Sequence, residues 1–338
     1  MRAYKCLSTQ IFRNGIFSIE PIRDEDQYEI LKIRNEQIYH LRQAKPLTVE
    51  AQENYFATVV SNLFEQENPN QLLFSFFENE VFIGYGGLVH INWIDRNAEI
   101  SFVMKTELES THFIQYWSNY LTLIEKVAFE DLNFHKIFTY AFDLRPHLYA
   151  ALLISGFKEE ARLKEHCFFE GQFLDVVYHA KINSNITSRK ANENDMLLYF
   201  EWTNEESVRE ASYHSEPIPL ESHQQWFLNK IKDPNSFMMV FENHIGTPVG
   251  QVRIEKSESN NALIGISNDA KYRGKGYAIA MIQMASMAFL DKNPETSISA
   301  FIKIENKASE KAFAKAGYIL EGITEYESIP SYHYIKKL

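Results

Sequence analysis

The chain has 338 residues, of which 45% are hydrophobic and 23% charged, and its formal net charge is −11 from 34 Lys+Arg and 45 Asp+Glu. These proportions are typical of a folded globular protein and exclude disorder as the main state, and the length predicts two domains of roughly 100–200 residues each. The acidic balance offers no basic face, so we expect no nucleic-acid partner.

Two segments, residues 17–182 and 186–338, follow one plan, which predicts a tandem repeat. The matching features, in chain order, are a helical run ending Ile33-Arg34-Asn35 or Trp202-Thr203-Asn204, a segment 45–56 or 216–227 with the same Pro-to-Phe interval, an apolar strand 72–78 or 237–242, a second strand opening on Gly84 or Gly250, and a closing Gly156-Phe157 or Gly317-Tyr318. Five matches in one order are not expected by chance. We therefore predict domains at residues 1–183 and 184–338, joined by the polar segment 183–185.

The sequence of each copy predicts the same order of elements: a strand, two helices, three strands, a helix, a strand, a helix and further strand. In the second copy, strands are expected at 248–255 and 262–267 because these runs are apolar and end in turn residues. Residues 278–290 are strong helix formers without Gly or Pro. A buried strand at 297–304 and a helix at 308–317 complete the copy. The expected fold class is α/β (an α+β mixed sheet), with helices packed on a central sheet.

The segment 268–277, between the strand at 262–267 and the following helix, has a pattern suited to an anion. Gly274 and Gly276 allow positive φ and close backbone approach, and the helix N-terminus favours negative charge. Lys271, Arg273 and Lys275 add three positive charges in five residues. The pattern favours a pyrophosphate ligand over a plain solvated turn, although it matches neither a Walker loop nor GxGxxG.

The run K-Y-R-G-K-G (271–276) resembles the [QR]-x-x-G-x-[GA] loop of the GNAT N-acetyltransferases, with Lys271 departing at the first position. Asn306, Ser309 and the segment 313–318 are similar to the second motif of that family, N-x-x-[SA] before a helix and Gly-aromatic. The resemblance implies two tandem GNAT-like domains, with acetyl-CoA as co-substrate. The residues that it implies for acetyl-CoA binding are Ile266, Ser267, Asn268, Lys271, Arg273, Gly274, Lys275, Gly276, Tyr277, Ala278, Asn306, Ser309 and Phe313.

The first copy lacks this loop. Residues 104–112 contain no glycine, Glu107 and Glu109 would face a diphosphate, and Arg145 falls at the position of Asn306. We therefore expect the first copy to be degenerate for acetyl-CoA. Its runs 84–88 (GYGGL) and 98–103 (AEISFV) resemble the ribosomal-protein N-acetyltransferases, which leaves an activity there open.

The stretch 202–227, leading to 248–254, resembles the GNAT branch that acetylates nucleotide-linked amino sugars in pseudaminic acid biosynthesis. That resemblance implies a nucleotide-linked amino sugar of surface-glycan biosynthesis as acceptor. The expected contact residues are Asn204, Glu216, Trp226 and Arg253. The usual W-R-N of the branch reads W-T-N here (202–204), so its arginine is missing. Trp226 fits a core position better than a position that stacks on the sugar.

Two residues are candidates for the proton acceptor. Alternation along 250–255 puts Arg253 and Glu255 on one face. If that face lines the substrate-binding cleft, Arg253 contacts a substrate phosphate and Glu255 accepts a proton. If it faces solvent, both residues are surface charges. His223 lies on a predicted helix and is either the base or a structural histidine. We expect direct attack on the thioester, because Phe313 replaces the tyrosine that acts as acid in many members of the family.

The remaining expectations concern partners and location. Cys6 and Cys167 are far apart, which favours a reducing compartment and a cytoplasmic protein. The 11 histidines form no metal motif and no apolar run reaches about 18 residues, so neither a metal nor a membrane is expected. The alternatives to the amino-sugar enzyme are a protein N-terminal or small-amine acetyltransferase and a non-catalytic acyl-CoA-binding scaffold. The protein is expected to be a monomer or a homodimer.

Overall fold

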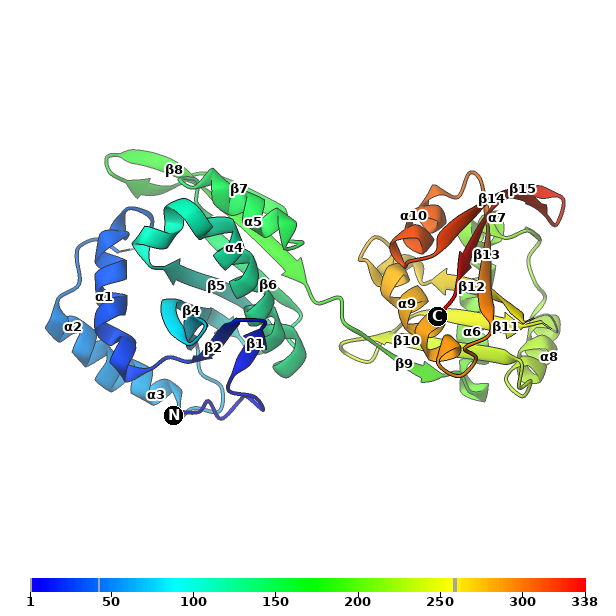
Figure 1. The fold of residues 1–338 in the computed structure, drawn as a ribbon, viewed down its shortest axis with the longest axis horizontal. Coiled ribbons are helices and arrows are strands. Elements are labelled where there is room, and N and C mark those ends of the chain that lie inside the picture. The colour runs from blue at the N-terminus through cyan, green and yellow to red at the C-terminus, as the bar shows by residue number, and fades with distance from the viewer. Residues whose placement is uncertain (1, 42, 258–259) are drawn as a thin grey trace. The chain divides into compact units, whose positions relative to one another are not determined.

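The computed structural model describes residues 2–41, 43–257 and 260–338. The chain divides into two compact units, Met1–Asn183 and Ser184–Leu338, here called the N-terminal and C-terminal domains (Figure 1). Asn183, expected in a polar linker, is instead fully buried, and its side-chain amide donates to the Phe134 carbonyl at 2.8 Å. This residue is polar because it satisfies a buried backbone group of the N-terminal domain.

The N-terminal domain alternates strands and helices. Its strands are β1 (Phe12–Asn14), β2 (Phe17–Pro21), β3 (Leu72–Glu78), β4 (Val81–Asn92), β5 (Asn97–Met104), β6 (Lys136–Phe142), β7 (Lys158–Phe169) and β8 (Gln172–Ile182). Its helices are α1 (Gln27–Glu36), α2 (Val49–Asn54), α3 (Ser61–Leu63), α4 (Thr106–Glu125) and α5 (Pro146–Ile154). Strand β4 begins three residues before Gly84, the residue expected to open it.

The C-terminal domain repeats this order. Its strands are β9 (Ile186–Lys190), β10 (Ser236–Asn243), β11 (Pro248–Lys256), β12 (Asn261–Asn268), β13 (Ser297–Lys303), β14 (Ile319–Tyr326) and β15 (Ile329–Lys336). Its helices are α6 (Met196–Asn204), α7 (Glu206–Ala211), α8 (Leu220–Lys230), α9 (Tyr277–Leu290) and α10 (Lys307–Lys315). The short helix α7 was not expected.

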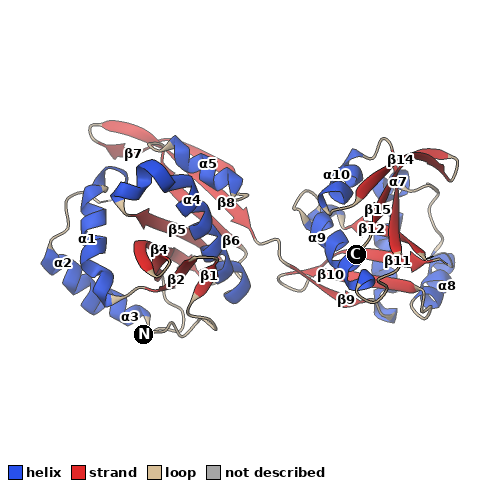
Figure 2. Cartoon of the chain, in the orientation of Figure 1, coloured by secondary structure: helices blue, strands red, loops and turns tan. Residues whose placement is uncertain are grey.

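Each domain contains one mixed sheet (Figure 2), and the two sheets share one strand order apart from the additional edge strand β1 of the N-terminal domain. The strand orders are β1-β2-β3-β4-β5-β6-β8-β7 and β14-β15-β13-β12-β11-β10-β9. In both sheets the only parallel neighbours among the described strands are β5 with β6 and β12 with β13. The predicted mixed α/β fold with two tandem domains is confirmed.

The repeat extends to single hydrogen bonds. The Asn35 side chain donates to the Leu47 carbonyl at 2.9 Å and accepts from the Leu47 amide at 2.8 Å. Asn204 makes the same pair with Ile218, at 3.0 and 2.7 Å. In each domain one asparagine at the end of a helix therefore fastens the loop that leads to the next helix.

The C-terminal sheet has helices on both faces. Val252 and Ile254 of β11 belong to a core that includes residues of α9 and α10, whereas Tyr199, Trp202 and Phe227 of α6 and α8 form a separate core on the other face. Arg253, on the α8 side, stacks against Trp226. The predicted alternation along β11 is therefore present. The α6–α8 side is here called the acceptor face.

The parallel strands separate soon after they meet. Pairing between β12 and β13 covers only residues 261–263 and 297–299, although the strands continue to Asn268 and Lys303. Pairing between β5 and β6 likewise covers only 97–99 and 136–138. Each domain therefore contains a fork, the place where the two parallel strands stop pairing and leave backbone groups without a neighbouring strand.

Candidate functional site

The glycine loop lies at the end of β12 and the start of α9. Gly274 has φ +75° and Gly276 has φ +89°, and nothing lies within 4 Å of a Cβ built on either. Both positions thus require glycine for their backbone conformation and not for lack of space. Gly276 caps α9, whose first turn reads Tyr277-Ala278-Ile279 and contains no carboxylate. The positive end of the helix dipole is therefore left available for an anion.

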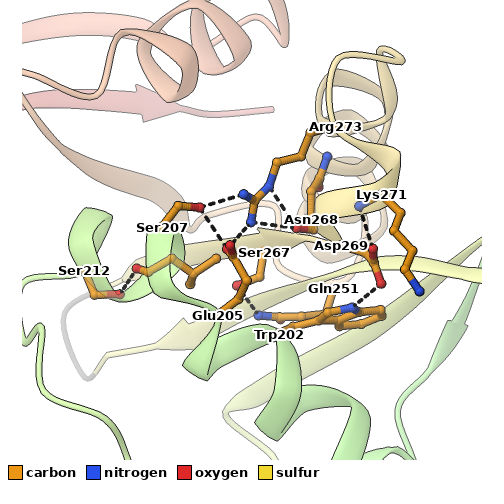
Figure 3. Close-up of polar contacts among 11 residues, drawn as sticks. Trp202, Glu205, Ser207, Ser212, Gln251, Ser267, Asn268, Asp269, Lys271 and Arg273 are labelled. Atoms are coloured by element: carbon orange, nitrogen blue, oxygen red, sulfur yellow. Dashed lines mark hydrogen bonds and ion pairs between the residues drawn. The ribbon is translucent and has the colours of Figure 1, made fainter.

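The loop's cations differ in their surroundings. The Arg273 guanidinium lies 2.5 Å from Glu205 Oε2, donates to Ser207 Oγ at 2.6 Å, and donates to the Asn268 carbonyl at 3.3 and 3.2 Å (Figure 3). The hydrogen bond from Arg273 holds the pKa of Glu205 below its usual range. Lys271 and Lys275 are exposed. The loop thus combines glycine backbone, a helix N-terminus and three cations.

The fork lies next to this loop and presents unpaired backbone. The Asp269 amide donates to the Val249 carbonyl at 2.9 Å, toward β11. Because the direction of backbone groups alternates along a strand, Ile266 points its amide and carbonyl the other way, into the fork. An extended ligand can add to such an edge as a further strand. Ile266 therefore presents unpaired backbone at the fork, whereas the backbone of its neighbour Ser267 faces β11.

The second motif lies at the start of α10. Asn306 caps this helix, because its side-chain oxygen accepts from the Ser309 amide at 3.1 Å. Phe313 is 3% exposed and packs edge-on against Tyr318, with ring centres 5.0 Å apart. The Phe313 ring has no proton to give, so this position supplies no general acid.

The acceptor face carries a chain of charged side chains. Arg253 lies 5.0 Å from the centre of the Trp226 ring, and its Nε is 2.6 Å from Glu255 Oε1. Lys230 Nζ is 2.6 Å from the other oxygen of Glu255. Glu255 is opposite Leu263, whereas Ile266 is opposite Val252. At about 3.3 Å per residue, Glu255 is therefore roughly 10 Å along the sheet from the level of Ile266.

The other predicted acceptor and base residues have different surroundings. His223 is 1% exposed and packs among Phe200, Trp226 and Phe227, and burial lowers its pKa. The structure thus places its ring in the packing between α6 and α8, against the same Trp226 ring that Arg253 contacts from β11. The Asn204 amide is engaged by Ile218, as described above, so it fastens a loop. Glu216 is exposed on that loop.

Two site residues were not predicted from the sequence. Gln251 is 6% exposed, donates to Ser267 Oγ at 3.3 Å, and its Oε1 has no hydrogen-bond partner among the described residues. Glu205 contacts the loop through Arg273. The alternation of β11 already placed Gln251 beside Arg253, so its polarity at a buried position was an available signal. No local signal pointed to Glu205.

In the N-terminal domain, a helix start replaces the loop. Helix α4 begins two residues after β5 ends. Gln37 is fully buried there and donates to the Met104 carbonyl at 2.7 Å and to Thr106 Oγ1 at 3.2 Å. Thr106 in turn donates to Glu36 at 2.5 Å. The N-terminal fork therefore ends in side chains of its own domain and not in glycine backbone.

An ion pair lies at the second-motif position of the N-terminal domain. Arg145 precedes α5, as Asn306 precedes α10, and donates to Glu109 Oε1 at 3.0 Å. Tyr39 donates to the other Glu109 oxygen at 3.1 Å. Burial and the neighbouring Arg145 lower the pKa of His40 to about 3, so its neutral ring faces Arg145 at 3.2 Å. In this domain, a carboxylate paired with Arg145 thus lies in the first turn of the helix that follows the fork.

The Glu109→Ala substitution should destabilise the N-terminal domain. The Arg145 and Glu109 side chains are only 13% and 17% exposed, so the variant leaves a mostly buried guanidinium without its carboxylate. We expect the free energy of unfolding to fall by roughly 2–4 kcal/mol. Native-state hydrogen exchange on peptides of this domain measures the change. The control is Glu107→Ala, an exposed acid in the same helical turn, and equal effects of the two variants would contradict the ion-pair account.

Among the residues that the structure describes, no group of three or more His, Cys, Asp or Glu side chains is arranged to hold a metal ion. No described helix is both long enough and apolar enough to cross a membrane. Cys6 and Cys167 are both free thiols.

Known proteins similar to this chain point to one family. A family model described as an acetyltransferase (GNAT) domain matches residues 19–178, and a second model with the same description matches residues 185–319. Spermidine N(1)-acetyltransferase of Vibrio cholerae serotype O1 (strain ATCC 39315 / El Tor Inaba N16961) is 34% identical over 100 residues, which make up 28% of this chain. The match spans about half (53%) of that relative's length.

Solved structures that match part of this chain include two acetyltransferases. Spermidine N-acetyltransferase from Vibrio cholerae, in complex with CoA and spermine, is 20% identical, covers 50% of this chain and 96% of its own, and has a TM-score of 0.44. Aminoglycoside acetyltransferase AAC(6')-Ib, in complex with coenzyme A, is 18% identical. The match covers 45% of this chain and 95% of that enzyme's chain, with a TM-score of 0.40. With one GNAT acetyltransferase model matching each of its domains, this chain belongs to the GNAT acetyltransferase family and carries two of its domains in tandem.

Proposed function

We propose that the C-terminal domain is an acetyl-CoA-dependent N-acetyltransferase and that the N-terminal domain does not bind acetyl-CoA. The observation that carries the proposal is the glycine loop at the N-terminus of α9, directly beside the fork of β12 and β13. GNAT enzymes use acetyl-CoA as their acetyl donor. In the N-terminal domain, the corresponding positions hold Glu109 and Arg145 paired with each other.

The residues of the C-terminal domain fit acetyl-CoA group by group. The backbone of Gly274 and Gly276, with the first turn of α9, suits the diphosphate. Lys271 and Lys275 add charge at the same place. The unpaired backbone of Ile266 suits the extended pantetheine arm, and Asn306 lies at the start of α10 on the other side of the fork.

The chemistry requires little from acidic side chains of the protein. The amine nitrogen attacks the thioester carbonyl carbon, the carbon–sulfur bond breaks, and the sulfur leaves as a thiolate. A thiol has a pKa near about 8.5, so the thiolate leaves without a general acid, which agrees with Phe313 at the position of the acid. The Ile266 amide polarises the carbonyl. Glu255 accepts the proton that the amine loses, through water, because only the neutral amine attacks.

Two acceptors are proposed within the class of primary amines. The sequence resemblance favours a nucleotide-linked amino sugar, and Arg253, over the Trp226 ring on the acceptor face, is a suitable contact for its phosphates. The match to a spermidine N(1)-acetyltransferase favours a polyamine. Arg253 distinguishes the two, since a polyamine has no anion for it to bind.

Steady-state kinetics with a panel of amines tests the proposal. We expect the highest kcat/KM with UDP- or dTDP-linked amino sugars, and we expect Arg253→Gln to lower that value at least tenfold more than it lowers the value for spermidine. Higher kcat/KM with spermidine, or with peptides that begin with alanine or serine, would contradict the amino-sugar assignment. Binding of acetyl-CoA without turnover of any amine would instead support the scaffold alternative.

A further inference from the structure

Glu205 lies between two helices and contacts the loop that holds the diphosphate in the proposed function. It ends α6 and caps α7 with an extended backbone. Its carboxylate is 2.5 Å from an Arg273 nitrogen that also donates to the Asn268 carbonyl, the last residue of β12 (Figure 3). Because one Arg273 nitrogen contacts both the Glu205 carboxylate and the Asn268 carbonyl oxygen, the Glu205 carboxylate lies beside the end of β12, at the mouth of the fork.

Helix α7 connects this point to the other arm of the fork. Lys303, the last residue of β13, donates from Nζ to the Glu210 carbonyl at 2.9 Å. Directly after α7, the Tyr213 hydroxyl lies 2.8 Å from Ser331 Oγ, and its ring packs 4.8 Å from that of Tyr326. The segment that starts at Glu205 therefore crosses from the acetyl-CoA loop to side chains of β13, β14 and β15.

We propose that Glu205 couples the two substrates: acetyl-CoA displaces its carboxylate from Arg273, and the released carboxylate then binds the ammonium group of the acceptor. The inference rests on the proposed function of the C-terminal domain. It assigns Glu205 as a positioning and specificity residue for the amine, with Arg273 as the group that passes from one anion to the other.

Charge and exposure make this exchange favourable. The Arg273 and Glu205 side chains are 36% and 32% exposed, and ion pairs with such exposure are weak because water screens them. A diphosphate has more charge than one carboxylate and reaches Arg273 together with Lys271, Lys275 and the helix terminus. The carboxylate that loses Arg273 then lacks a cation beside the fork, and a protonated amine supplies one.

The N-terminal domain has a carboxylate at the corresponding position, with a different partner. Glu36 follows the loop-fastening Asn35 just as Glu205 follows Asn204. Among the described residues, Glu36 accepts from Thr106, at the start of α4. The two domains therefore share an acid at the end of this helix, and in the C-terminal domain it pairs with Arg273, a cation that an anionic ligand can take from it.

The test measures both ligands on the Glu205→Gln variant of the full chain. Calorimetry should show acetyl-CoA binding about threefold tighter, because the competing carboxylate is gone. Steady-state kinetics should show the KM of the acceptor amine raised about tenfold or more, because a charge-assisted hydrogen bond is lost. Opposite changes for the two ligands are the signature, since general damage to the fold weakens both.

Two controls complete the experiment. Glu206→Gln removes the same charge from the next, exposed residue and should change neither value more than twofold. In an Arg273→Gln background, Glu205→Gln should leave acetyl-CoA affinity unchanged, because no exchange partner remains. Weaker binding of both ligands in Glu205→Gln, or unchanged values for both, would overturn the coupling. Absence of acetyl-CoA binding in the wild type would instead refute the proposed function.

Discussion

The Gly274→Glu variant is expected to bind no acetyl-CoA, whereas the wild-type chain should bind one molecule per chain in calorimetry. Gly274 has φ +75°, a conformation that costs an ordinary side chain about 1–3 kcal/mol. The larger effect is electrostatic, because a carboxylate at this position faces the diphosphate and opposes the cations of the loop. A side chain at position 274 also blocks the close approach of the diphosphate to the backbone, which the glycine hydrogen allows.

Gly246→Glu is the matched control for this prediction. Gly246 lies in the turn between β10 and β11 of the same domain, has φ +79°, and also has nothing within 4 Å of a built Cβ. The strain and the added charge are therefore the same, and only the distance from the loop differs. Normal binding by Gly274→Glu would refute the anion-binding role of the loop. Two equal sites in the wild type would show that the N-terminal domain also binds acetyl-CoA.

The elements around the loop could be predicted because their signals are local. Helix α9, expected at 278–290, spans Tyr277–Leu290, since its residues are strong helix formers without Gly or Pro. Strand β3 was expected at 72–78 and found there. The two-domain mixed fold followed from the repeated order of such elements. Helix α7 was missed because its polar six-residue sequence has no apolar periodicity.

The contacts that decide the chemistry could not be predicted, because they join residues far apart in the chain. Arg273 and Glu205 are 68 positions apart, and Arg145 and Glu109 are 36 apart. No spacing rule connects such pairs. The surroundings of His223 were open for the same reason, since a histidine on an amphipathic helix has the same sequence pattern whether its ring meets a substrate or, as here, Phe200 and Phe227.

The Glu255→Gln variant should lower kcat about 10²-fold with little change in the KM of the amine. Removing a general base costs roughly 10²–10⁴ in rate. The lower end is expected because Glu255 is roughly 10 Å along the sheet from the level of Ile266, so it takes the proton through water and not directly.

Lys230→Gln is the control, because it breaks the same 2.6 Å ion pair and keeps the carboxylate. Equal losses in both variants would make the effect structural. A histidine base would give the pH profile of kcat/KM a limb below the ordinary histidine value of about 6.5, since burial lowers the pKa of His223, and that limb would vanish in His223→Ala. If Glu255→Gln keeps full kcat while Glu205→Gln loses it, the proton goes to Glu205 instead. The two carboxylates are thus separated by whether kcat or KM changes, since proton transfer affects the chemical step and ammonium binding affects the Michaelis complex.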